Sequence, residues 1–240
     1  MQRVLKLAPR RRYCRNGPEG LSVSMPPPWN PLSLPNLLTW FDASDSSTIS
    51  NPSAVTQWRD KSLNANHLTP GVTAATGVPL VAASTLAGRD TMSFLGKTYF
   101  NLATKLTNVR SAFILCKWAD TTGYYRVIFG DDSGYQWHSD VVGSEAPLLS
   151  TYADGSIVNG SKYINGVLTE GYLSRYTTWT QHGFITLANT VIGNLSMDRT
   201  GYGYDRQFKG NIAEVVIMST VATNADRLAL QAYWTAKWGI

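Results

Sequence analysis

Cysteine, histidine and recognisable catalytic motifs are scarce in this chain, and their scarcity excludes several classes of function. The 240 residues contain two cysteines, Cys14 and Cys116, and three histidines, His67, His138 and His182. None of the histidines has a partner at metal-ligand spacing, and neither a Gly-x-Ser-x-Gly turn nor a phosphate-binding loop occurs. The sequence therefore predicts no metal site, no cofactor and no nucleophilic active site.

Glutamate is also rare, which bears on sugar-cleaving activity. The four glutamates, Glu19, Glu145, Glu170 and Glu214, lie far apart, and no two acidic residues are separated by two positions. Retaining glycosidases place two carboxylates about 5–5.5 Å apart, and a strand supplies such a pair most simply at positions i and i+2. Acids from different strands could still converge, but the sequence predicts a protein that is not an enzyme. Glu214, alone in an apolar strand pattern, is interpreted as a buried hydrogen-bonding residue.

Long hydrophobic runs are missing as well. No window approaches the 18 apolar residues of a membrane-spanning helix, so we expect no membrane partner. The apolar run "SAFILCKW" alternates instead, which places Ala112, Ile114, Cys116 and Trp118 on one face of a strand. Cys116 is therefore interpreted as a small core residue, and nothing in the sequence requires a disulfide to Cys14.

Positive charge is concentrated at one end of the chain. Six of the 21 basic residues and one of the 16 acidic residues lie before Asn36, which leaves 15 of each in the rest. The six basic residues are Arg3, Lys6, Arg10, Arg11, Arg12 and Arg15. A neutral body with a short cationic segment suits docking on an acidic surface. We predict two parts: a basic, Pro-rich N-terminal arm and linker over 1–35, and one domain over 36–240.

Two features of the linker and body indicate how each part folds. The stretch "MPPPWNPLSLP" favours an extended, stiff polyproline spacer. The body contains many short β-branched and aromatic runs separated by turn residues, and "YINGVL" carries the Asn-Gly signal of a tight hairpin. Its last 18 residues change to a helical period, with Thr223 and Asp226 at capping-box spacing and Gly239 at the end. Leu230, Trp234 and Trp238 share one face of this helix.

Three segments resemble a known domain type. They are "LLTWFDASDSSTI" (37–49), "VTQWRDKSLNANHL" (55–68) and the closing "GNIAEVVIMSTVATNADRLALQAYWTAKWGI" (210–240). With "YINGVL", they resemble concanavalin A-like, laminin G-type jelly-roll domains, which occur in tailed-phage virion proteins and bacterial surface proteins. The resemblance covers about residues 36–240 and implies an all-β fold: a two-sheet antiparallel jelly-roll sandwich with a C-terminal helix. That fold hosts enzymes, lectins and structural modules, so it does not assign a function.

Within the second segment, the residues themselves predict a local arrangement. Asp60 and Ser62 are expected to bond nearby backbone amides in a turn, while Trp58 enters the core.

Loop-like aromatic segments supply the candidate ligand surface. They contain Tyr135, Trp137 and His138 in "GYQWHSD", and Tyr176 and Trp179 in "RYTTWTQH". Exposed rings of this kind stack on sugars, but they also cover sandwich edges or form subunit contacts. A cell-surface glycan and a homo-oligomeric contact therefore both stay open as partners.

Two functional hypotheses remain, and the basic arm favours the first. In the first, the chain is a non-catalytic structural protein located in the virion of a tailed phage, as a capsid decoration, head-fibre or tail-associated protein. Its arm binds another virion protein through forked arginine–carboxylate contacts. In the alternative, it is a carbohydrate-binding, receptor-recognition protein. A nucleic-acid partner is disfavoured, because the body is neutral and the arm lacks interleaved aromatics.

Overall fold

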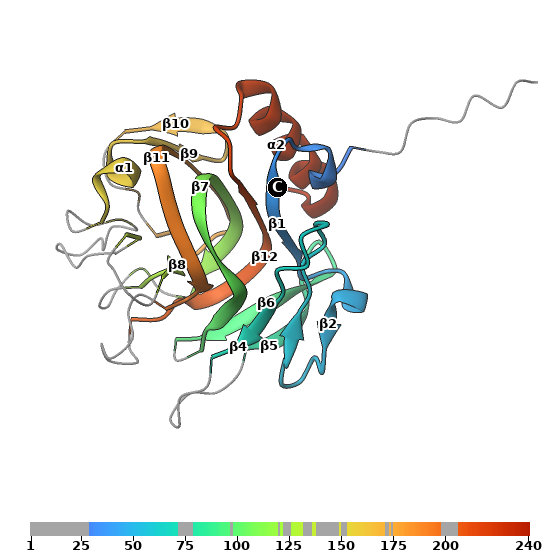
Figure 1. Cartoon of the computed structure of the whole chain (residues 1–240). Helices are drawn as coiled ribbons and strands as arrows, with labels where there is room; N and C mark the ends of the chain where they lie inside the picture. Colours follow the sequence, from blue (N-terminus) through green and yellow to red (C-terminus); the bar gives the residue numbers. More distant parts are fainter. Residues whose placement is uncertain are drawn as a thin grey trace, which may run out of the picture.

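Within the part of the chain that the structure describes, twelve strands form one antiparallel, hydrogen-bonded sheet that folds over into two layers, and a helix packs on one of them (Figure 1). The computed structural model describes residues 29–71, 79–96, 98–119, 121, 126–131, 136–137, 149, 153–170, 173, 175–197 and 206–240. The predicted all-β antiparallel sandwich with a C-terminal helix is confirmed.

The strands are mostly short, with two long exceptions. They are β1 (Leu37–Asp42), β2 (Ile49–Ser50), β3 (Gln57–Trp58), β4 (Leu68–Pro70), β5 (Leu80–Leu86), β6 (Arg89–Leu95), β7 (Phe100–Trp118), β8 (Phe129–Gly130), β9 (Ser161–Ile164), β10 (Val167–Thr169), β11 (Thr180–Leu195) and β12 (Lys209–Met218). The helices are α1 (Gly155–Val158) and α2 (Asn224–Trp238). In the described ranges, neither helix has the length and apolar character needed to cross a membrane.

The long strands β7 and β11 connect the two layers. They pair with each other from Thr180↔Cys116 to Leu195↔Phe100, with irregular register between Ile185 and Asn194. At one end β7 pairs with β12 and β11 with β9, whereas at the other end β7 pairs with β4 and β11 with β8. The same two strands therefore contribute to both layers.

The first strand of the body pairs with the last. β1 runs antiparallel to β12, from Leu37↔Met218 to Asp42↔Glu214. The other end of β12 pairs with β6, as in Lys209↔Leu95. One edge of β12 is thus shared by two strands that lie far earlier in the sequence.

Two cores form on the two faces of β7, as the alternating pattern predicts. Ala112, Ile114, Cys116 and Trp118 belong to the main core between the layers. The intervening Phe113 belongs to a second core beneath α2. Cys116 is a free, fully buried thiol whose pKa is raised by burial, so it behaves as a core residue.

The local signals in the sequence are confirmed at two turns. Asn165 (φ 48°) and Gly166 (φ 80°) form the tight hairpin between β9 and β10, where both central residues need positive φ. Thr223 and Asp226 form a complete capping box at the start of α2, and Gly239 ends the helix with φ 70°.

The linker departs from the predicted extended spacer in its described part. Pro31–Ser33 form a single 3-10 turn, with the Asn30 side chain accepting from the Leu32 backbone N–H. Pro31 and Leu34 are buried, and Leu34 belongs to the second core. The physical reason is that apolar linker residues gain more by burial against α2 and β1 than by remaining extended in water. The domain boundary at 35/36 stays a prediction.

Candidate functional site

A group of charged side chains surrounds Glu214, on the face of β12 that α2 covers. Register shifts between Ile212 and Glu214 where β12 pairs with β7. Consequently Ile212 points into the main core, whereas Glu214 points toward α2. Glu214 is fully buried and accepts hydrogen bonds from the indole N–H groups of Trp40 (2.6 Å) and Trp238 (2.7 Å). It is the hydrogen-bonding residue that the sequence predicts.

A second carboxylate and a lysine complete what we call the carboxylate cluster: Trp40, Asp42, Glu214, Lys237 and Trp238. Asp42 lies opposite Glu214 on β1. The Lys237 ammonium lies 2.7 Å from Asp42 Oδ2 and 3.2 Å from Glu214 Oε2. The cluster therefore joins α2 to β1 and β12 at one point.

The two carboxylates of the cluster have opposite pKa shifts. Burial raises the pKa of Glu214 to about 7, with the Asp42 charge adding to the effect and Lys237 opposing it. Burial acts in the same direction on Asp42, but Lys237 and Lys61 together outweigh it and lower the pKa of Asp42. Lys61 lies 2.9 Å from Asp42 Oδ2 and its ammonium sits 4.4 Å from the Trp40 ring centroid.

The convergence of Asp42 and Glu214 raises the question of carboxylate-pair catalysis. Sequence reasoning missed this pair, because it depends on the pairing of β1 with β12. The Asp42 side chain is 4% exposed and Glu214 is 0% exposed. Glu214 is engaged by two buried indoles and Asp42 by two partly buried lysines, so a polymer could not reach between the carboxylates. The arrangement suits fastening a helix to a sheet rather than attacking a substrate.

The raised pKa of Glu214 makes stability depend on pH in a predictable direction. The folded-state pKa of Glu214 is above the ordinary value of 4.5. Its contribution to the free energy of unfolding is therefore fully present below pH 4.5 and declines as pH rises through about 7. We expect the stability advantage of the wild type over Glu214→Gln to shrink by on the order of 2 kcal/mol between pH 4.5 and 8. Urea unfolding of both proteins at each pH measures this difference.

Subtracting the stability of Glu214→Gln from that of the wild type cancels the effect of His182, which changes stability with pH in the opposite direction. This side chain is fully buried in the main core, and burial lowers its pKa to about 3. Its contribution is therefore lost as pH falls from 6.5 toward 3, identically in both proteins. A difference that stays constant, or grows with pH, would contradict the role assigned to Glu214.

A surface groove of about 670 Å³ opens where the linker meets α2. Trp29 packs edge-on against Tyr233 of α2, with ring centroids 5.8 Å apart. Arg89, Lys237 and small residues of α2 complete the walls. Trp29 is thus held in the same groove as Lys237 of the carboxylate cluster. The predicted arm residues Arg3, Lys6, Arg10, Arg11, Arg12 and Arg15 lie outside the described residues.

The predicted aromatic surface is only partly as expected. The prediction of an exposed ring is wrong for Trp137. This side chain is 3% exposed and donates its indole N–H to Val191 O at 3.0 Å. The rings of Phe129 and Phe184 pack edge-on against the Trp137 ring, with centroids 5.1 and 5.5 Å away, which places Trp137 in the main core. Tyr135 and His138 lie outside the described residues.

The other two predicted aromatics are half-buried and lie on different faces. The Tyr176 ring lies 6.1 Å from the His182 ring, on the side of the main core. Trp179 packs against the second core, on the face that α2 also covers. The structure therefore does not bring them together into one site.

Trp179 instead belongs to a line of side chains across the sheet, which we call the outer row: Trp179, Lys117, Asn211 and Ser93. Trp179 directly precedes β11, and the Lys117 ammonium lies 5.4 Å from the Trp179 ring centroid. Lys117 pairs with Asn211 on β12, and Asn211 pairs with Ser93 on β6. All four residues are partly exposed.

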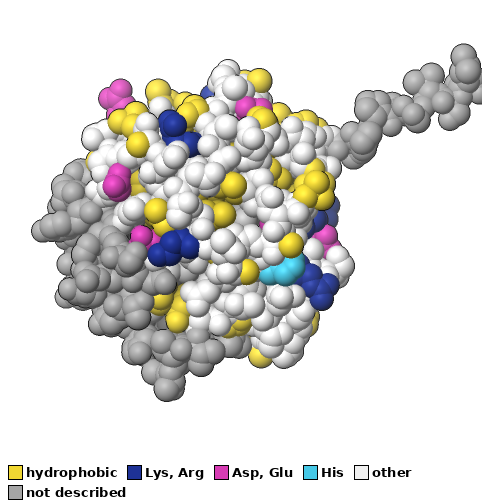
Figure 2. All heavy atoms as spheres, viewed as in Figure 1, with side chains coloured by type: hydrophobic (Ala, Val, Ile, Leu, Met, Phe, Trp, Pro, Cys, Tyr) yellow, Lys and Arg dark blue, Asp and Glu magenta, His cyan; other side chains and the backbone are white. Residues whose placement is uncertain are grey.

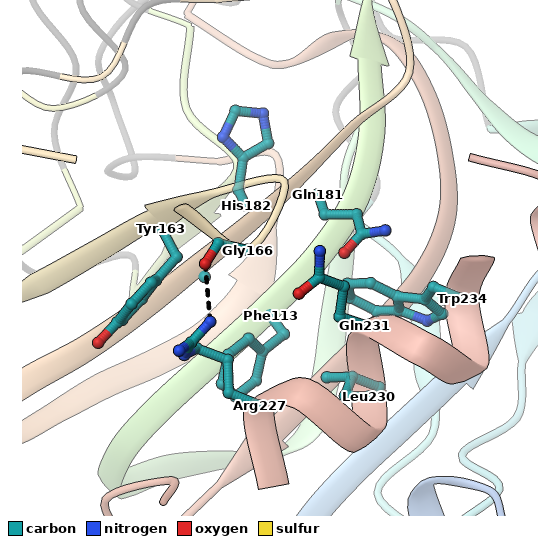
Figure 3. Close-up of a pocket in the computed structure, with 10 residues that line it drawn as sticks. Phe113, Tyr163, Gly166, Gln181, His182, Arg227, Leu230, Gln231 and Trp234 are labelled. Carbon is teal, nitrogen blue, oxygen red and sulfur yellow. Dashed lines mark hydrogen bonds between the residues drawn. The ribbon is translucent and has the colours of Figure 1, made fainter. Parts of the chain in front are cut away.

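The Asn-Gly turn and α2 enclose a smaller cavity (Figure 3). Arg227 donates to Gly166 O at 2.8 Å, and its guanidinium lies 4.1 Å from the Tyr163 ring centroid. His182 also borders the cavity, but its imidazole points away from α2. At about 20 Å³ the cavity has room for a water molecule and not for a larger ligand. Within the described ranges, no three His, Cys, Asp or Glu side chains are grouped so as to hold a metal ion.

Comparisons with known proteins give little beyond the fold. A scan against models of protein families found no match, and a search of curated proteins found no relative. Among solved structures, the chain is similar to domain 4 of AbnA, a GH43 extracellular arabinanase from Geobacillus stearothermophilus, in complex with arabinotriose. The TM-score is 0.49 at 16% identity, with 82% of this chain and 98% of that chain covered. A likeness this distant carries no argument about ligand or activity.

Proposed function

We propose that this chain is a non-catalytic structural protein of a tailed-phage virion. In this proposal the basic arm attaches the protein to another virion protein, and the β-sandwich displays a recognition surface. The observation that carries it is the separation of charge, since the first 35 residues hold a net +5 and the remainder is neutral. A separate cationic segment is suited to an acidic partner surface and not to the fold of its own domain.

The surface of the body supports this division of roles. On the face in Figure 2, charged side chains of both signs are scattered over the described part without a patch of one sign. This face therefore offers no extended positive surface that would attract an acidic protein over a long range. The attraction to an acidic virion protein is therefore assigned to the arm.

The root of the arm supports attachment at a fixed position. Trp29 is held by Tyr233, and Leu34 is buried in the second core. Thr220 donates its hydroxyl to Pro35 O at 3.5 Å, and Ser219 donates its backbone N–H to Asn36 O at 3.0 Å. An arm anchored in this way would present the sandwich in a defined orientation.

The use of the acidic residues supports a non-catalytic role. Several carboxylates accept hydrogen bonds from backbone N–H groups, lysines or indoles that hold the fold together. They are Asp42, Asp45, Asp60, Asp154, Glu214 and Asp226. Groups engaged in this way are not poised for proton transfer to a substrate.

Deletion of residues 1–28 tests the proposal. We expect the truncated chain to fold with an unchanged thermal transition, since Trp29 and the buried linker residues are retained, but to be lost from purified particles. Particles made with wild-type or truncated chain would be isolated by sedimentation and probed for the protein by immunoblotting. Replacing Arg10, Arg11, Arg12 and Arg15 by Gln in the full chain should have the same effect.

Charge replacement on the body provides the control. Arg59 and Lys105 are exposed, and their replacement by Gln should leave incorporation unchanged. Incorporation of the truncated chain at the wild-type level would contradict docking through the arm. If the full-length chain does not associate with particles at all, the virion assignment itself is wrong.

A further inference from the structure

We infer that the outer row is a binding site for a carboxylate-bearing oligosaccharide. Lys117, Asn211 and Ser93 lie on adjacent strands in one cross-strand line, so their side chains point to the same side of the sheet. Trp179 joins them on that side, because its ring contacts Lys117 and packs against the second core. With strands about 4.8 Å apart, the row from Lys117 to Ser93 spans about 10 Å, and the Trp179 ring beside Lys117 extends it to the length of a short oligosaccharide. This inference is independent of the docking of residues 1–28.

The row lies on the same face as α2 but is not sealed by it. Phe113 and Leu115 of β7 are buried in the second core, whereas Lys117, two residues further, is partly exposed. On β12, Asn211 is likewise partly exposed while Glu214 is fully buried. The sheet thus passes from a covered to an open surface at this row.

The chemistry of the row fits a sugar with a negative charge. Trp179 offers an indole face for stacking, and Asn211 and Ser93 offer hydrogen-bonding groups for hydroxyls. Lys117 supplies a cation, and its ammonium contacts the Trp179 ring. Among the described residues no carboxylate forms an ion pair with Lys117, so an anionic ligand would complete its environment.

The amide of Asn211 is held in place before any ligand arrives. Its Nδ2 donates to Thr91 Oγ1 at 3.2 Å, and Thr91 shares a hydrogen bond of 2.5 Å with the Thr85 hydroxyl. Thr91 is fully buried, so this network anchors the amide from within the sheet. Side chains fixed by such bonds lose less conformational freedom when they bind a ligand.

A saccharide fits the row better than an acidic peptide does. Peptide recognition normally buries apolar anchors in a pocket or adds a strand to a free edge. The outer row crosses strands that are already paired, and it has one aromatic and three polar members. A line of polar groups with a single stacking platform matches a chain of hydroxylated rings.

Titration of the full-length protein with trimers of galacturonate, mannuronate and glucuronate tests the inference, with maltotriose as the neutral comparison. The readouts are the binding isotherm and the NMR shift of the Trp179 indole N–H. We expect saturable binding of at least one uronate trimer and none of maltotriose. Trp179→Ala should weaken binding by about tenfold or more, and Lys117→Gln by up to about fivefold.

The basic arm is the main competing anion-binding element, so an arm variant is the matched control. Replacing Arg10, Arg11, Arg12 and Arg15 by Gln should leave the uronate isotherm unchanged. Binding that is lost in this variant but kept in Trp179→Ala would assign the ligand to the arm and overturn the inference. Absence of an indole shift with all three uronates, or equal binding of a glutamate peptide, would also overturn it. Trp179→Phe, which keeps most of the apolar packing, guards against a folding defect in Trp179→Ala.

Discussion

Replacing Glu214 by Ala is expected to lower the free energy of unfolding by about 3–5 kcal/mol. The substitution removes the acceptor for two indole N–H groups, those of Trp40 and Trp238, which lie in the buried second core. Each buried donor left without a partner costs about 1–3 kcal/mol. Lys237 also loses one of its two carboxylate neighbours.

Urea unfolding followed by tryptophan fluorescence would measure this loss, and two further variants define its origin. Glu214→Gln keeps the size of the side chain but turns an N–H group toward one of the donors, so we expect an intermediate loss. Glu170→Ala removes an exposed glutamate and should change stability by less than about 0.5 kcal/mol. If Glu214→Ala were no worse than Glu170→Ala, the carboxylate cluster would not be what holds α2 on the sheet.

Replacing Asp60 by Ala is expected to cost about 2–4 kcal/mol. Asp60 is buried, and its two carboxylate oxygens organise the turn that follows β3. Oδ1 accepts from the backbone N–H groups of Trp40 (2.9 Å) and Ser62 (2.8 Å). Oδ2 accepts from the Ser62 hydroxyl (2.6 Å) and the Asn66 backbone N–H (3.0 Å). The carboxylate thereby ties the turn to β1.

Thermal and urea unfolding of Asp60→Ala and Asp60→Asn, with Asp154→Ala as control, would test this prediction. Asp154 also accepts a backbone N–H, from Ser156, but at an exposed helix cap, where loss costs about 0.5–2 kcal/mol. Asp60→Asn should lose less stability than Asp60→Ala and more than Asp154→Ala. Its amide keeps one oxygen as an acceptor, but its N–H group faces the N–H and O–H donors of the turn. Equal losses for Asp60→Ala and Asp154→Ala would show that burial does not amplify the role of Asp60.

The parts of the fold that follow from short-range patterns were predictable from the sequence. The Asn165-Gly166 turn needs positive φ at both positions, which few residue pairs tolerate. The capping box of α2 and its buried Trp234 and Trp238 follow from spacing alone. Asp60 and Ser62 form the predicted turn, and Trp58 is buried as predicted.

The candidate sites depend on long-range register, which the sequence does not encode locally. Asp42 approaches Glu214 only because β1 pairs with β12, and a register shift turns Glu214 toward α2. The outer row needs the register of β7, β12 and β6 at once, together with the approach of Trp179 to Lys117. Trp137 looked like a loop residue because its sequence neighbours are polar, but its contacts come from Phe129 and Phe184.

The pairing of β1 with β12 has a consequence for how the protein is made. Trp40 and its acceptor Glu214 are 174 residues apart, so a ribosome adding about 5–20 residues per second needs roughly 10–35 s between them. During that interval β1 has no β12 to pair with, so its apolar side chains are not buried and the sandwich cannot form. We therefore expect a chaperone to bind the nascent chain transiently. We also expect slow folding, because the contacts that complete the sandwich join residues far apart in the sequence.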